Sequence, residues 1–160
     1  MNDRFKFRIW DKEQNKYLPL VSRGDDIDFW ISLDNTGVYL VERDNNRDVA
    51  YFNDITEDVI VQFCTGLKDK NDKLIYDGDI LRYPPKDQYE EKNYVACEVF
   101  FHNNDCCDSH IGFQMNRYRF QGALCGIANY GSKYKFIPKN TEKMEIIGNI
   151  YENKELLEEE

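Results

Sequence analysis

Residues 63–83 read FCTGLKDKNDKLIYDGDILRY, and this stretch decides the fold predicted for the chain. The letters indicate a strand that ends at Cys64, followed by a polar turn over residues 68–73. A short apolar segment over residues 74–76 then leads through a tight corner into a second strand over residues 80–83. The β-branched, apolar and aromatic content of these segments is typical of strands.

The turns in this stretch depend on three residues. Gly66 and Gly78 can take a positive φ, which strains any residue with a Cβ. Asn71 is one of the few other residues that tolerate the left-handed region. We therefore expect the corner at Gly78 to direct Ile80 and Leu81 into the interior of a small sheet.

Three blocks of sequence frame almost the whole chain: FKFRIWDK at residues 5–12, TGLKDKN with IYDGDI between residues 65 and 80, and IIGNIYEN at residues 146–153. In these blocks the chain resembles the YopX family of phage and prophage proteins. The family usually has Asn-Gly in the central turn, where this chain has Asn71-Asp72. The resemblance implies an SH3-like β-barrel or roll in the C-terminal part and a phage or prophage accessory role. It assigns no catalytic residue.

Composition indicates a folded, β-rich protein, because 41% of the 160 residues are hydrophobic and 14% are aromatic. The predicted fold is mainly β, with an N-terminal antiparallel hairpin region, the SH3-like barrel or roll that the resemblance implies, and a short C-terminal helix. The whole of residues 1–160 is interpreted as a single YopX-like chain. A possible subdivision separates an N-terminal β region, residues 1–56, from a barrel region, residues 57–160.

Alternating and turn-forming residues predict the other elements. A strand over residues 4–10 precedes a polar turn, and residues 27–33 and 38–43 flank the hairpin sequence DNTG. Residues 49–58 are interpreted mainly as a loop, and the proline-led residues 84–93 as a surface loop. The C-terminal helix is expected to begin with Asn153 as its cap.

The net charge of −9 argues against a protein that binds DNA non-specifically, because Lys and Arg supply most of the affinity of such proteins for DNA. Asp3, Arg4 and Lys6 interrupt the start and no apolar segment follows them, so no signal peptide is expected. No apolar run is long enough to span a membrane. We therefore expect a cytoplasmic protein, in a host bacterial cell if the resemblance holds, with reduced cysteines.

Residues 102–110, HNNDCCDSH, contain the only cluster of metal-ligand types. His102, Cys106, Cys107 and His110 together match the donor set of a tetrahedral zinc site. Adjacent cysteines are awkward for chelation, because structural zinc sites draw ligands from spaced pairs. The favoured interpretation is a polar loop without metal, and no cofactor is expected.

A basic stripe alternates with apolar residues in the first predicted strand. It consists of Arg4, Lys6 and Arg8. Three interpretations are open: a solvated strand face, a contact with the acidic loops of a second copy, or a nucleic-acid contact. Solvation is favoured, and contact with a second copy comes next.

No sequence signature of a nucleophilic, nucleotide-binding or metalloprotease site occurs in the chain. Asp77 and Asp79 could pair as hydrolase carboxylates, but acids on a turn more often accept bonds from backbone amides. The sequence therefore favours a non-enzymatic module that binds a protein partner or itself. The alternative is a small β-barrel module that binds nucleic acid.

Overall fold

The chain is built mainly from β-strands, as predicted. The computed structural model describes residues 6–23, 27–33, 37–85, 88–92, 94, 96–102, 112–118 and 137–157. In chain order the elements are β1 (Phe7–Asp11), β2 (Lys16–Tyr17), β3 (Val21–Arg23), β4 (Ile27–Leu33), β5 (Val38–Asp44), β6 (Val49–Asp54), a 3-10 turn (Thr56–Asp58), β7 (Val59–Lys68), β8 (Leu74–Tyr76), β9 (Asp79–Arg82), α1 (Gln88–Lys92), β10 (Ala96–His102), β11 (Gly112–Tyr118), α2 (Pro138–Thr141), β12 (Glu145–Asn149) and a second 3-10 turn (Lys154–Leu156).

The chain packs into two compact units. One is Phe7–Gln62, and the other combines Met1–Lys6 with Phe63–Glu160. We call them the 7–62 unit and the 63–160 unit. The subdivision considered from the sequence, after residue 56, falls in the turn that precedes β7, whereas the units divide within β7 itself.

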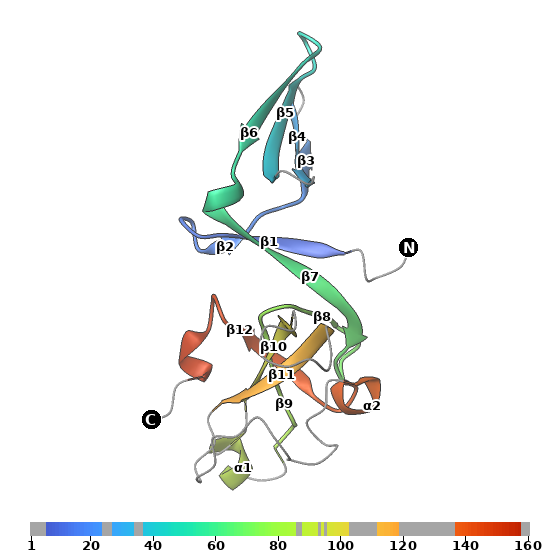
Figure 1. Cartoon of the computed structure of the whole chain (residues 1–160), viewed down its shortest axis with the longest axis vertical. Helices are drawn as coiled ribbons and strands as arrows, with labels where there is room; N and C mark the ends of the chain where they lie inside the picture. Colours follow the sequence, from blue (N-terminus) through green and yellow to red (C-terminus); the bar gives the residue numbers. More distant parts are fainter. Residues whose placement is uncertain are drawn as a thin grey trace. The chain divides into compact units, whose positions relative to one another are not determined.

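The 7–62 unit contains a four-stranded antiparallel sheet in the order β3-β4-β5-β6, with β6 at one edge (Figure 1). Leu33 pairs with Val38, which confirms the hairpin predicted around DNTG. In the same unit β1 lies between β2 and the first residues of β7. The core contains Ile9, Val38 and Val59, with Phe7, Leu18, Leu20, Ile31, Leu33, Ile55 and Val61 packed against it.

The 63–160 unit contains a second sheet in the order β11-β10-β9-β12. Its strand β9 follows the corner at Gly78, which has a φ of 80°. Ile80 and Leu81 come next and are both 0% exposed, as predicted. Leu81 belongs to the core of this unit together with Ile75, Cys97, Val99 and Met144.

The central turn differs in detail from the prediction. Strand β7 runs past Cys64 to Lys68 and pairs with β8, with Gly66 at a φ of 79° inside it. The left-handed residue of the following turn is Asp72, with a φ of 64°, so the expectation for Asn71 is wrong.

Three further predictions need correction. Residues 49–54 form the complete strand β6, because they pair continuously with β5. The helix α1 lies within the predicted surface loop of residues 84–93. The C-terminal helix is a single 3-10 turn. Asn153 is at its N-cap position, as predicted, but its side chain makes no capping bond, since its side-chain oxygen accepts the Asn149 amide at 3.3 Å. The SH3-like closure stays a prediction.

Candidate functional site

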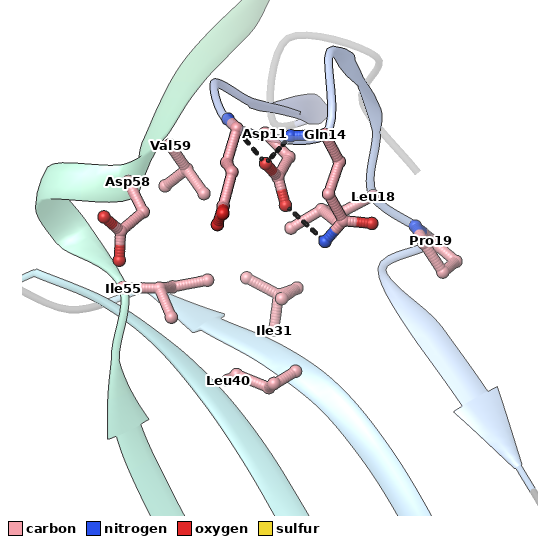
Figure 2. A pocket seen from close by; sticks show the side chains of 10 residues that line it. Asp11, Gln14, Leu18, Pro19, Ile31, Leu40, Ile55, Asp58 and Val59 are labelled. Atoms are coloured by element: carbon pink, nitrogen blue, oxygen red, sulfur yellow. Dashed lines mark hydrogen bonds between the residues drawn. The ribbon is translucent and has the colours of Figure 1, made fainter.

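A hollow of about 310 Å³ opens in the 7–62 unit (Figure 2). Figure 2 shows Asp58 at one side and Leu18 with Pro19 at the other, with Ile31 and Leu40 beneath them. Its floor consists of apolar side chains, and the carboxylates of Asp11, Glu13 and Asp58 lie at its sides. The lining residues are Asp11, Glu13, Gln14, Leu18, Pro19, Ile31, Leu40, Ile55, Asp58 and Val59.

Asp11 fixes one wall of the hollow, at the turn between β1 and β2. Its Oδ1 accepts the backbone amides of Glu13 at 2.9 Å and Gln14 at 2.7 Å, while Oδ2 accepts the Gln14 side-chain amide at 2.9 Å. This carboxylate is buried and its acceptors are used in holding the turn. Its role here is to position Glu13 and Gln14.

The opposite wall is the 3-10 turn that carries Asp58. Gly37 allows this turn to approach, because a Cβ at that position would collide with the Thr56 hydroxyl. The Thr56 hydroxyl oxygen accepts the Val38 amide at 2.9 Å, and the Lys12 amide donates to the Asp58 carbonyl oxygen at 3.0 Å. The backbone under Asp58 is therefore held from both β5 and the β1–β2 turn.

Two carboxylates at the hollow are available to a ligand. Glu13 and Asp58 are both exposed, and within the described part of the chain neither side chain makes a hydrogen bond or an ion pair. The nearby ammonium of Lys12 is directed to the carbonyl oxygen of Glu57, at 2.6 Å. The arrangement combines an apolar floor with unpaired negative charge.

Strand β6 is the second exposed feature of the 7–62 unit. All six of its residues are exposed, including Tyr51 at 48% and Phe52 at 67%. Opposite Phe52 on β5 lies Val41, which is 0% exposed, and Val41 in turn pairs with Trp30 on β4. Directly paired residues share a face of the sheet. Phe52 thus extends an apolar row to the edge of the sheet.

The backbone of β6 also presents unpaired polar groups. The Ile55 amide donates to the Val38 carbonyl oxygen at 2.9 Å, so Ile55 faces β5. Alternate residues of an antiparallel strand face the same neighbour, which turns the amides of Tyr51 and Asn53 toward β5 as well. The amides of Ala50 and Phe52 therefore point away from the sheet. No strand in the described ranges pairs with that side of β6.

The predicted basic stripe is divided between the two units. Lys6 is exposed and belongs to the 63–160 unit, where its carbonyl oxygen accepts the Cys64 amide at 2.9 Å. Arg8 belongs to the 7–62 unit, where its Nε donates to the Gln62 side chain at 2.9 Å and its guanidinium lies 4.7 Å from the centre of the Tyr17 ring. Arg4 lies outside the described residues.

The loop of residues 102–110, which was considered as a zinc site, falls almost entirely outside the described residues. His102 is the last residue of β10 and pairs with Gly112, while Cys106, Cys107 and His110 lie outside. Within the described ranges, no three metal-ligating side chains come together. The favoured interpretation, a polar loop without metal, and the zinc alternative are therefore both untested.

Asp77 and Asp79 serve the backbone of the corner. Asp79 is 1% exposed, and its Oδ2 accepts the Tyr76 amide at 2.8 Å. Burial raises the pKa of Asp77, an effect that the amide of Phe101 opposes and the charge of Glu98 increases. This matches the interpretation of the two acids as acceptors for backbone amides.

Both exposed features escaped prediction from the sequence. The β6 strand carried a usable signal: VAYFN, residues 49–53, is uncharged and lies between Asp48 and Asp54. No sequence pattern marked the hollow, because its lining comes from several strands and turns that meet only in the folded unit.

Comparison with known proteins gives a family and similar solved structures. A family model described as YopX protein matches residues 6–158. The crystal structure of protein EF1440 from Enterococcus faecalis is similar at a TM-score of 0.54 and 24% identity, covering 96% of this chain and 97% of that one. This likeness shows the fold alone. No curated protein matches the chain. Among the helices of the described residues, none is long and apolar enough to cross a membrane.

Proposed function

This chain belongs to the YopX protein family, and we propose that it is a non-enzymatic interaction module that pairs strand β6 with the same strand of a second copy. The observation that carries the proposal is the edge of β6, where exposed apolar side chains accompany outward-facing amides. Natural proteins usually protect such an edge with charges, proline or a bulge. Residues 49–53 contain no charge and no proline.

A second copy suits this edge for electrostatic reasons. The chain has a net charge of −9, so two copies repel each other over most surfaces. The uncharged residues 49–53 form a segment where that repulsion is locally small. If two β6 strands pair antiparallel about a two-fold axis at Phe52, Phe52 of one copy lies opposite Phe52 of the other. Ala50 of each copy then lies opposite Asp54 of the other. That register brings aromatic rings together and keeps the two carboxylates apart.

A non-enzymatic role is supported by the use that the fold makes of its acids. Asp11 and Asp79 each accept backbone amides, so these carboxylates are committed to holding turns. The family resemblance supports a phage or prophage accessory role, and a cytoplasmic location remains part of the same proposal. The nucleic-acid alternative has less support, since Arg8 is engaged with Gln62 and Tyr17.

Light scattering coupled to size exclusion tests the pairing on the full chain, from about 1 μM to about 500 μM. We expect a monomer–dimer equilibrium that shifts with concentration. Phe52→Lys should raise the dissociation constant at least about tenfold, because it places two like charges side by side at the axis. The matched control is Tyr89→Lys, which replaces another exposed aromatic residue, on α1. A wild-type chain that stays monomeric throughout, or an equal effect of both substitutions, would rule out the proposal.

A further inference from the structure

We propose that the hollow of the 7–62 unit binds the side chain of a lysine on a partner polypeptide. This site is separate from the β6 edge, and the inference does not depend on pairing between copies. It is drawn from the size of the hollow, the apolar floor and the unpaired charge around it.

The size of the hollow limits what it can hold. Its volume of about 310 Å³ lies at the low end of the range of about 300–1,000 Å³ that is typical of small-molecule sites. One extended side chain suits this space better than a nucleotide or a larger cofactor. The occupant should therefore be narrow and should enter from the open side.

The floor favours an aliphatic stem. Ile31 and Leu40 come from β4 and β5, and Ile55 follows β6. All three are only partly buried, so a ligand lying on them would remove further apolar surface from water. A lysine carries four methylene groups before its charge, and such stems commonly lie along apolar surface.

The wall supplies the complementary charge. The carboxylates of Glu13 and Asp58 make no hydrogen bond or ion pair within the described part of the chain. Lys12 is the nearby cation, and its ammonium is directed to the Glu57 carbonyl oxygen. An ammonium group at the end of the stem can therefore pair with a carboxylate at the hollow without displacing an internal partner.

Lysine is favoured over arginine because of what the lining lacks. None of the ten lining residues is aromatic. A guanidinium gains much of its advantage by stacking on aromatic faces and by forked bonds, whereas an ammonium is a compact point charge. The hollow offers separate carboxylates above an aliphatic floor, and this arrangement suits an ammonium group better than a guanidinium.

The test is an NMR titration of the full chain with the peptide Ac-Gly-Lys-Gly-NH₂, followed through methyl resonances. We expect saturable shifts at Ile31, Leu40 and Ile55, and none at Ile146 of the 63–160 unit. The same peptide with norleucine in place of lysine keeps most of the stem without the charge, and it should bind about tenfold more weakly.

The charge is tested from the protein side with the double variant Glu13→Gln/Asp58→Asn. Both side chains are exposed, so the variant should fold normally and bind the lysine peptide about tenfold more weakly. The control, Glu142→Gln/Glu152→Gln, removes two exposed charges from the 63–160 unit and should leave binding unchanged.

Three results would overturn the inference. They are the absence of saturable shifts, equal binding of the norleucine peptide, and equal weakening by the control variant. Binding of n-butylammonium at least as tightly as the lysine peptide would assign the hollow to small amines, and would overturn the assignment to a polypeptide.

Discussion

At the residue scale, buried aspartates hold the turns of this protein. Asp69 is 3% exposed and Asp79 is 1% exposed. Asp69 accepts the amides of Asn71 at 2.8 Å, Lys73 at 2.9 Å and Ile146 at 3.2 Å. Burying a carboxylate is costly unless hydrogen bonds replace its water. The bonds found here meet that requirement and fix the backbone at the same time.

Asp79→Ala should therefore destabilise the chain markedly. It would leave the Tyr76 amide and the side chain of Asn149, which donates to Asp79 at 3.3 Å, without their acceptor. We expect the free energy of unfolding, measured with urea, to fall by about 2–3 kcal/mol. Asp79→Asn retains one acceptor and should lose less.

Glu152→Ala is the control for this measurement, because Glu152 is exposed and should change the free energy of unfolding by no more than about 0.5 kcal/mol. Similar losses for Asp79→Ala and Glu152→Ala would show that the buried carboxylate does not hold the corner.

At the element scale, Glu145 joins β12 to β9 and to the turn after β7. It forms ion pairs with Lys70 and, at 2.8 Å, with Arg82, whose side chain is 17% exposed. The hydrogen bond from Lys70 lowers the pKa of Glu145, burial opposes that effect, and Arg82 adds to it. The charged carboxylate thus stabilises the packing of three segments.

This interaction predicts a pH dependence of stability. Because the pKa of Glu145 is lowered in the folded state, its stabilising contribution is present above the unfolded pKa, near 4.5, and is lost as the pH falls through the folded pKa. Glu145→Gln should lower the free energy of unfolding at pH 7 by about 1–3 kcal/mol. The difference in the free energy of unfolding between Glu145→Gln and the wild type should shrink as the pH approaches about 3.

Urea unfolding at a series of pH values checks this prediction, with Glu142→Gln as the control for an exposed acid. Asp77 has a raised pKa, so its effect on the pH dependence of stability has the opposite sign. This effect is the same in all chains and cancels when each variant is compared with the wild type. A deficit for Glu145→Gln that stays constant from pH 7 to pH 3 would contradict the account.

The elements that sequence predicts well here are those fixed by local chemistry. Gly78 takes a positive φ, and Ile80 and Leu81, which follow it closely, are apolar residues of the kind that is usually buried. Strand β6 escaped prediction because both of its faces are exposed, so no alternation between apolar and polar residues marks it. Its register depends on β5, which a local pattern does not reveal.

The candidate site was less predictable than the fold. Arg8 alternates with apolar residues in the sequence, so a solvated position was favoured for it. In the structure its side chain donates to the buried side chain of Gln62 and lies over the ring of Tyr17. The sequence indicates only a polar turn at Asp11, and the burial of this residue depends on the packing of the turn in the 7–62 unit. These outcomes are set by tertiary contacts between residues far apart in sequence.

At the scale of the whole molecule, an acidic chain presents a strand edge in which residues 49–53 are uncharged. The net charge of −9 opposes association between copies in general, and the repulsion is locally small at residues 49–53, which carry no charge. Pairing there would join two four-stranded sheets into one. The alternating direction of the β6 amides makes this arrangement open to a direct test.

That test is amide hydrogen exchange, resolved by residue and measured at low and high protein concentration. The Tyr51 amide faces β5 and should be protected at both concentrations. The Ala50 and Phe52 amides face outward, and pairing with a second copy predicts that their exchange slows as the concentration rises. Fast exchange of Ala50 and Phe52 at every concentration would contradict the proposal that β6 pairs with itself.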